Sequence, residues 1–267
     1  GAMIIAMIGA VFTGCGNNST SNDGTVTITV SGSTSVGPLM EKIAEKYEEE
    51  NSNISIEINQ TGSSAGIKDA MDGISQIGMS SRDLKDEEAA KVKATVLAYD
   101  GVAVITNTGN SVKELTIGQI RDIFTGKITN WSEVGGSNAS IVVVSREAGS
   151  GTRTAFEEGV GYSEEELVKD AIISKGNGDV KTTVSTNENA IGFVSFEYVD
   201  DAISSINVNG IEPTAANVKA GSYALSRPFL AVTNEQYITE DSQKLIDYIT
   251  SEEGQQIVED NKLITID

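Results

Sequence analysis

Histidine is absent from this sequence of 267 residues, and Cys15 is its one cysteine. Without histidine the chain has no His-based acid–base catalyst, no Ser–His–Asp or Cys–His nucleophile and no histidine ligand for a metal. A single cysteine excludes an intramolecular disulfide and a cysteine-rich metal site. The chain also has no calcium-binding loop of the Asp-x-Asp-x-Asp-Gly type. We therefore expect no enzyme activity, no metal and no cofactor.

Basic residues are scarce as well. The 19 Lys and Arg stand against 39 Asp and Glu, which gives a formal net charge of −20. Such a charge repels the phosphate backbone of nucleic acids, so we expect no nucleic-acid partner. Proline is limited to 3 residues, and the hydrophobic fraction of 39% is typical of a globular chain. The length fits two lobes of ordinary size better than one.

The N-terminal segment resembles a targeting signal. Residues 3–13 are apolar but fall short of the about 20 residues that cross a bilayer, and they suit the apolar region of a secretory signal. Residues 11–15 (VFTGC) resemble a bacterial lipobox, and residues 16–25 are polar, as a flexible tether would be. We expect residues 1–24 to be a truncated signal, lipobox and tether, with Cys15 as the lipid anchor. The alternative is that the apolar run is a buried strand or helix and that Cys15 is an ordinary core cysteine.

Strand-like and helix-like patterns alternate from residue 25 onward. Residues 25–30 (TVTITV) alternate in the manner of a strand, and residues 141–144 (IVVV) are typical of a strand buried on both faces. Further strands are expected at 54–58, 191–196 and 229–232, with a strand pair at 96–106 that a turn at Asp100-Gly101 interrupts. Helical spacing of apolar residues predicts helices near 39–47, 67–74, 117–124, 164–172 and 241–258. The alternation predicts an α/β fold with a mainly parallel sheet.

Three of the expected strand-to-helix junctions are rich in glycine and hydroxyl side chains: residues 31–38 (SGSTSVGP), 61–66 (TGSSAG) and 146–153 (REAGSGTR). Free N–H groups and the positive dipole end of a helix bind anions, and glycine lets the backbone approach the ligand closely. Three of the five arginines, Arg82, Arg146 and Arg153, fall in or beside these turns, where a guanidinium can hold two oxygens of an oxyanion. One such turn alone would indicate only a capped helix. Together, the three predict a shared anion site at the carboxyl ends of the strands.

These runs resemble the phosphate-binding subunit of Pst-type phosphate ABC transporters, a family of extracytoplasmic solute-binding proteins. The resemblance extends from about residue 25 to the C-terminus. Its most specific pieces are residues 32–36 (GSTSV), 62–66 (GSSAG), 77–82 (IGMSSR), 119–131 (QIRDIFTGKITNW) and 146–152 (REAGSGT). We interpret the fourth piece structurally, as a helix with a C-cap at Gly126 and an aromatic, Trp131, packed in the second lobe.

The resemblance implies ligand contacts at matching positions: Thr34, Ser35, Ser63, Arg146, Ser150, Gly151 and Thr152. In the family's usual pattern an Asp accepts the phosphate proton, and Ser81 stands at that position here. The acceptor is then Ser81 through its hydroxyl oxygen, or a carboxylate from Asp100 or Asp83. Asp100 is the preferred candidate, because a carboxylate repels fully ionised sulfate while a hydroxyl can rotate to donate.

The resemblance also implies the fold and the function. The fold would be the two-lobe, type II periplasmic-binding-protein fold, with the ligand cleft between lobes and two hinge crossings. Lobe one would comprise residues 25–102 and 225–267, and lobe two residues 103–224. The protein would be a monomer that captures inorganic phosphate on the outer face of the cytoplasmic membrane and delivers it to ABC permease subunits. The alternatives are a receptor for another oxyanion, such as sulfate or molybdate, and a surface adhesion or structural module that reuses the fold.

Overall fold

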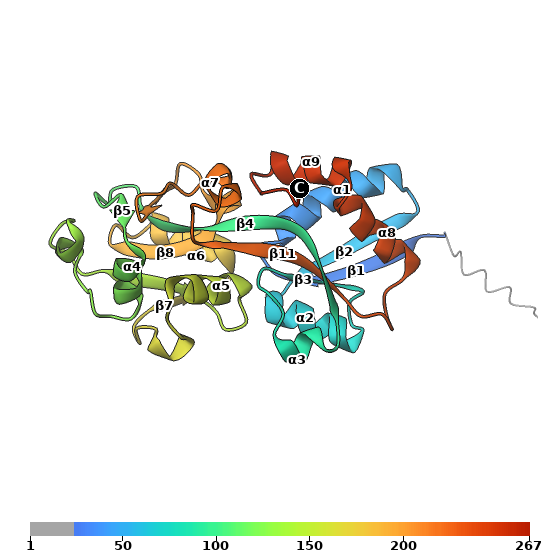
Figure 1. The fold of residues 1–267 in the computed structure, drawn as a ribbon, viewed down its shortest axis with the longest axis horizontal. Coiled ribbons are helices and arrows are strands. Elements are labelled where there is room, and N and C mark those ends of the chain that lie inside the picture. Colours follow the sequence, from blue (N-terminus) through green and yellow to red (C-terminus); the bar gives the residue numbers. More distant parts are fainter. Residues whose placement is uncertain (1–23) are drawn as a thin grey trace, which may run out of the picture.

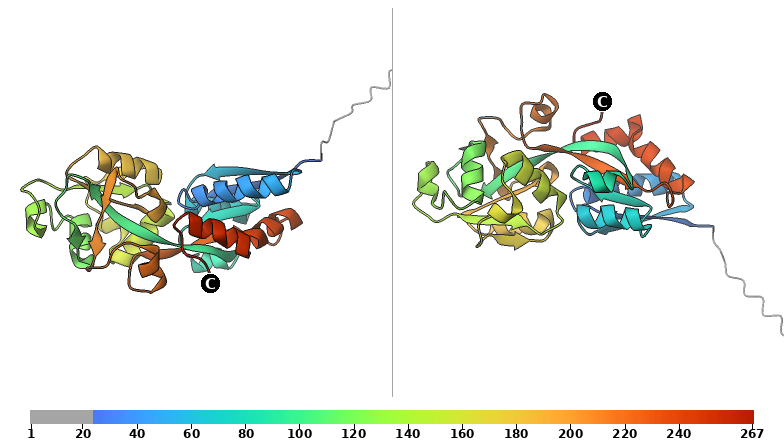
Figure 2. Two further views of the ribbon diagram at one scale, coloured as in Figure 1. Left: turned by 90° about the horizontal axis from the view of Figure 1, so that it is seen from above. Right: turned by 60° about the horizontal axis from the view of Figure 1, so that its bottom comes forward.

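Two lobes lie side by side and are joined by two long strands (Figure 1). The computed structural model describes residues 24–267, so the predicted lipobox and Cys15 lie outside the described residues. The joining strands are β4 (Lys93–Asn107) and β11 (Ser226–Thr233). Seen from two further directions, the lobes meet at a waist through which these strands pass (Figure 2). The chain therefore crosses between the lobes twice, as the two-lobe fold requires.

Lobe one is built from both ends of the described chain. Its remaining elements are β1 (Val26–Gly32), α1 (Gly37–Glu50), β2 (Ile54–Gln60), α2 (Ser63–Asp72), β3 (Ile77–Ser80), α3 (Asp86–Ala89), α8 (Glu240–Ile249) and α9 (Glu252–Asp260). Helices α1, α8 and α9 cover one face of its sheet, and α2 and α3 cover the other (Figure 1).

Lobe two is built from the middle of the chain. Its elements are β5 (Glu114–Leu115), α4 (Ile117–Phe124), η1 (Trp131–Val134), β6 (Val142–Arg146), α5 (Gly151–Val160), η2 (Glu164–Glu166), β7 (Ile172–Ser174), α6 (Gly176–Ser185), β8 (Ala190–Ser195), η3 (Phe196–Tyr198), β9 (Ile203–Ser205), β10 (Asn207–Val208) and α7 (Ala215–Lys219).

One sheet runs through both lobes in the order β2-β1-β3-β11-β4-β8-β6-β7, with β9 also paired to β4. In lobe one, β1 pairs with β2 and β3 in parallel, and in lobe two β6 pairs with β7 and β8 in parallel. The pairings of β11 with β3 and β4, and of β4 with β8 and β9, are antiparallel. The prediction of a mainly parallel sheet was therefore wrong at the centre, because the two crossing strands run in opposite directions.

Each lobe has its own hydrophobic core. The core of lobe two draws on residues between Val102 and Leu225, with Phe156 stacked on Phe193 at a centroid distance of 4.0 Å. The main core of lobe one draws on residues between Ile28 and Ala98 and again from Phe229 onward. The expected strands at 25–30, 54–58, 141–144, 191–196 and 229–232 are confirmed to within three residues at each end.

Three local predictions were wrong, two because tertiary contacts override the local pattern and one because of a local helix cap. Residues 164–172 form only a short 3-10 turn before strand β7, since the N–H of Val168 bonds to the carbonyl of Phe124 instead of continuing a helix. The predicted turn at Asp100-Gly101 lies inside the continuous strand β4. The expected helix 241–258 is two helices, α8 and α9, because the hydroxyl of Ser251 caps a new helix start.

The interpretation of the Gly126–Trp131 region is confirmed. Gly126, just beyond α4, has the positive φ of 75° that favours glycine. Trp131 is 1% exposed in the core of lobe two, and its indole N–H donates to the carbonyl of Asn189. Within residues 24–267, no helix has both the length and the apolar character needed to cross a membrane.

Candidate functional site

Three loops of lobe one bring hydroxyl groups to one edge of the sheet. Because β1, β2 and β3 are parallel, their carboxyl ends meet at the same edge. The loop after β1 carries Thr34 and Ser35, the loop after β2 leads into Ser63 at the start of α2, and Ser81 follows β3. Helices α1 and α2 begin here, so two positive helix ends face the same region.

Lobe two contributes the end of β6 and the start of α5. Arg146 is the last residue of β6, and Gly151 and Thr152 lie in the first turn of α5. The hydroxyl of Ser150 caps this helix by accepting the N–H of Arg153 at 3.2 Å. The helix end, the guanidinium and the hydroxyl of Thr152 therefore come together on one short segment.

The two sets of residues touch across the cleft. The hydroxyls of Ser35 and Thr152 are 2.7 Å apart, and Nη2 of Arg146 donates to Oγ1 of Thr34 at 3.1 Å. A Cβ added at Gly151 would lie 2.2 Å from Oγ of Ser63, so glycine is required for this approach. The structure thus brings together the loops that carry all the ligand residues expected at the turns.

A chain of buried hydroxyls lies within this cluster. Oγ of Ser33 accepts the N–H groups of Ser35 and Val36, so its own hydrogen is donated to Oγ of Ser81 at 2.9 Å. Oγ of Ser63 accepts the N–H of Ser81 at 3.0 Å and lies 3.2 Å from the Ser81 hydroxyl. Protein donors already occupy much of the acceptor capacity of these oxygens, so the hydroxyls are predisposed to donate to an incoming anion.

Arg146 is buried to 1% exposure and is held by its neighbour in sequence. The carboxylate of Glu147 accepts hydrogen bonds from Nε of Arg146 at 2.8 Å and from Nη2 at 2.9 Å. Nη1 of Arg146 is buried and has no hydrogen-bond partner within residues 24–267. Burial favours the neutral form of Glu147, but its hydrogen bonds and ion pair with Arg146 outweigh this and lower the pKa of its carboxyl. One buried N–H direction of a rigidly held guanidinium is thus left for a ligand.

Of the other charged candidates, Arg82, Arg153 and Asp100 form ion pairs with other residues, and Asp83 is exposed. Arg82 forms a two-pronged ion pair with Glu88, and Arg153 pairs with Glu157. Asp100 is fully buried in β4 and accepts Nη2 of Arg227 at 2.9 Å. Burial raises the pKa of the Asp100 carboxyl, and the adjacent guanidinium opposes this rise. Asp83 is exposed on the loop after β3.

Sequence reasoning missed three residues of the cluster. Ser33 stands inside the GSTSV run and was passed over there, although its hydroxyl organises the loop. Asn177 donates to Oγ of Ser35 at 2.9 Å from the start of α6. It follows Gly176 in a fourth glycine-rich turn before a helix, the same signal that identified the other three. Tyr198 donates from its hydroxyl to the carbonyl of Thr34 at 3.2 Å, and no local pattern indicates this contact.

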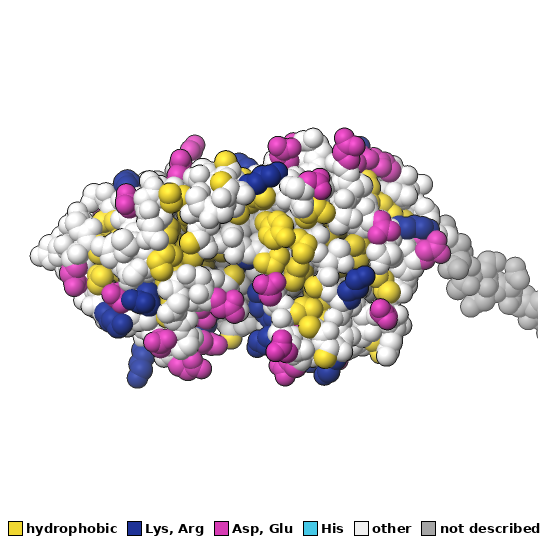
Figure 3. Space-filling view, viewed as in Figure 1, with side chains coloured by type: hydrophobic (Ala, Val, Ile, Leu, Met, Phe, Trp, Pro, Cys, Tyr) yellow, Lys and Arg dark blue, Asp and Glu magenta, His cyan; other side chains and the backbone are white. Residues whose placement is uncertain are grey.

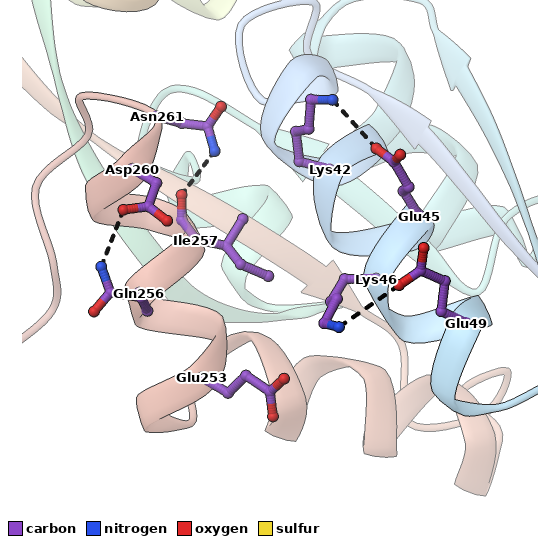
Figure 4. Close-up of a pocket in the computed structure, with 9 residues that line it drawn as sticks. All are labelled: Lys42, Glu45, Lys46, Glu49, Glu253, Gln256, Ile257, Asp260 and Asn261. Atoms are coloured by element: carbon purple, nitrogen blue, oxygen red, sulfur yellow. Dashed lines mark hydrogen bonds and ion pairs between the residues drawn. The ribbon is translucent and has the colours of Figure 1, made fainter.

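A separate groove of about 580 Å³ lies between α1 and α9 of lobe one (Figure 4). Its lysines, Lys42 and Lys46, pair with glutamates of their own helix. On the face shown in Figure 3, acidic side chains are scattered over both lobes rather than gathered around one opening. The groove lacks the helix N-termini and buried hydroxyls of the cleft, which remains the candidate site.

Comparisons with known proteins agree with this architecture. The family model described as the PBP superfamily domain matches residues 17–253. A phosphate-binding protein PstS of Borreliella burgdorferi is 30% identical over 98% of this chain and 98% of its own length, and that of Bacillus subtilis is 32% identical over 90% and 80%.

Two solved structures are also similar over most of their length. A phosphate ABC transporter substrate-binding protein of Clostridium perfringens, solved with bound phosphate, is 56% identical with a TM-score of 0.89, over 91% of this chain and all of that one. An ABC-type phosphate transport receptor of Vibrio cholerae is 35% identical with a TM-score of 0.76, over 90% of this chain and all of that one.

The Arg146–Glu147 pair predicts a pH-dependent contribution to stability. At pH 7, Glu147→Gln should lower the free energy of unfolding by about 1.5–3 kcal/mol, since it weakens charged hydrogen bonds to a buried guanidinium. The pKa of Glu147 is lower in the folded protein, so this stability is present above the ordinary value of 4.5 and is lost as the pH falls through the folded value. Urea titrations between pH 3 and pH 7, with the exposed Glu235→Gln as control, would measure it. A difference that persists unchanged at the acid end would contradict the assignment.

Proposed function

Because the chain belongs to the PBP superfamily and, within it, to the phosphate-binding proteins of the PstS type, we propose that it captures inorganic phosphate outside the cell. It delivers the anion to the permease of an ABC transporter, without chemistry on the ligand. The family is one of substrate-binding transport proteins and not of enzymes. The observation that carries the proposal is the convergence of Arg146 with the buried hydroxyls of both lobes. The names of the relatives favour phosphate over sulfate or molybdate and over an adhesion module.

The residues act by exchanging contacts with one another for contacts with the anion. Thr34, Ser35, Ser63, Ser81 and Thr152 donate to phosphate oxygens when the lobes close on it. Arg146, Ser150 and Gly151 complete the site through the guanidinium and the N-terminal turn of α5. Charge-assisted hydrogen bonds of roughly 1.5–3 kcal/mol each are sufficient for a micromolar affinity, which needs about 8 kcal/mol, after ordering costs.

The net charge of −20 does not oppose this function. Surface charges are screened beyond roughly 8–10 Å at physiological salt, so distant carboxylates act weakly on a ligand buried in the cleft. The local groups decide the affinity, and most of them are donors.

The protein would work as a lipid-anchored monomer. Cys15 would hold it at the outer face of the cytoplasmic membrane, and residues 16–24 would give the lobes their reach. We take lobe one as residues 25–102 and 225–267 and lobe two as residues 103–224. The separate hydrophobic cores support this division except at its two boundaries, because Val102 and Leu225 pack in the core of lobe two.

Removing the cation of the site tests the function directly. Arg146→Ala should weaken phosphate binding by about 2–4 kcal/mol, because one member of a desolvated charge pair is lost. Isothermal titration calorimetry with phosphate, sulfate and molybdate would measure the affinity and the selectivity, and the control is Arg121→Ala, a partly exposed arginine on α4. An unchanged dissociation constant in the Arg146 variant would overturn its role.

Selectivity against sulfate depends on the proton acceptor. Near neutral pH phosphate keeps a P–OH donor that sulfate lacks, so an acceptor favours phosphate. We propose Asp100 ahead of Asp83, since Asp100 is fully buried in the strand that joins the lobes, whereas Asp83 is exposed.

Asp100→Asn should then narrow the phosphate-over-sulfate ratio by at least about tenfold, or about 1.4 kcal/mol. Competition titrations with both anions measure the ratio. If this variant keeps the full ratio while Ser81→Ala loses it, the acceptor is Ser81.

The anchor is tested by mass spectrometry of the full-length protein from its native membrane. A diacylglyceryl adduct on an N-terminal Cys15 is expected. Recovery of an unmodified Cys15 still preceded by residues 3–14 would exclude it.

A further inference from the structure

Glu197 of lobe two lies where the two lobes meet. It belongs to the short helix η3, directly after β8, and lines a cavity of about 300 Å³. The opposite wall comes from lobe one: Pro38 in the first turn of α1 and residues 260–262 at the end of α9. Its neighbour Tyr198 donates to the carbonyl of Thr34, in a ligand loop of lobe one. In this arrangement of the lobes Glu197 is therefore half-buried between them.

The carboxyl group of Glu197 is poorly compensated in this position. Its Oε1 is buried and has no hydrogen-bond partner within residues 24–267. Arg227, the cation whose charge acts on Glu197, is already bound to Asp100 at 2.9 Å, so its guanidinium compensates two carboxyl groups.

The charged and titratable groups around Glu197 come from each element that packs against it. They are Glu41 of α1, Asp100 of β4, Arg227 of β11, Tyr198 of η3, and Asp260 and Lys262 at the end of α9. Two further groups interact electrostatically with these neighbours: Tyr223 with Asp100, and Arg146 with Tyr198. Two of these groups, Glu41 and Asp100, oppose a negative charge on Glu197, as does burial itself.

We propose that Glu197 is a proton-binding site that fills when the lobes close, so that the protein takes up a proton together with phosphate. The inference rests on the proposed phosphate function. Opening the cleft withdraws the wall of lobe one and returns the carboxylate to water. Closing removes that water, and a solvent proton binds to a carboxylate oxygen of Glu197. The proton offsets one negative charge in a region that must accept an anion while already holding Asp100 and Glu147.

Proton uptake on closure makes the phosphate affinity depend on pH. Burial, followed by the charge of Asp100, raises the pKa of Glu197 to about 9 in the closed form, against an ordinary value of 4.5 in water. Between these values the closed form binds one proton more than the open form, so raising the pH disfavours closure. The phosphate affinity of the wild type should fall by up to about tenfold per pH unit relative to Glu197→Gln.

Calorimetry of phosphate binding at pH 7, in buffers of different ionisation enthalpy, counts the protons taken up. The protonation of phosphate itself is common to all variants and cancels in their difference. Wild type should take up close to one proton more than either Glu197→Gln or Glu197→Ala. Circular dichroism would verify that both variants fold. The exposed Glu45→Gln on α1 should match the wild type.

Two outcomes separate the inference from the function on which it rests. Phosphate binding with equal proton counts in wild type and both Glu197 variants would overturn the proton site and leave the function standing. Failure of the wild type to bind phosphate would overturn the function, and the proton site with it.

Discussion

The antiparallel pairing of β4 with β11 carries the chain between the lobes in both directions, and the site depends on it. Beyond this pairing β11 bonds to β3 in lobe one, whereas β4 bonds to β8 in lobe two. The ion pair of Asp100 with Arg227 lies at the crossing, with both side chains at most 1% exposed. A buried pair of this kind contributes little net stability, but losing one partner leaves a costly unpaired charge. The crossing is thus fixed in register while the lobes on either side meet through hydroxyls and helix ends.

Those lobe-to-lobe contacts are small and polar, in contrast to the cores behind them. Thr152 and Asn177 of lobe two each form a hydrogen bond with the hydroxyl of Ser35 across the cleft, at 2.7 Å and 2.9 Å. Each such bond has a net worth of only about 1 kcal/mol, because water would replace it on opening. An anion that accepts the same donors can therefore tip the balance between open and closed forms.

The local sequence pattern predicted the features that depend on neighbouring residues in the sequence. The TVTITV strand, the IVVV strand and the glycine-rich turns follow from side-chain alternation and from the demands of helix starts, and the structure confirms the strands and the helices that follow the turns. The loops with Thr34 and Ser63 meet because the parallel strands of lobe one end at one edge. Arg146 reaches Thr34 from lobe two, across the cleft.

Long-range partners could not be predicted in the same way. Asp100-Gly101 has the composition of a turn, yet Arg227 lies opposite Asp100 on β11, and the ring of Phe196 occupies the place of a Cβ at Gly101. The burial of Glu197 depends on residues of lobe one that are distant in sequence. One of them, Pro38, precedes Glu197 by more than 150 residues. No pattern within the FEY segment indicates it.

The order of the chain has a consequence for how the molecule forms. The core of lobe two is complete once residue 225 is available, whereas the main core of lobe one needs β1 near the beginning and Val258 and Leu263 near the end. Contacts so distant in sequence close large loops and form slowly. During synthesis from the N-terminus, lobe two can fold before β11, α8 and α9 are available to complete lobe one. The cleft therefore forms last, when the C-terminal segment packs against the N-terminal strands of lobe one.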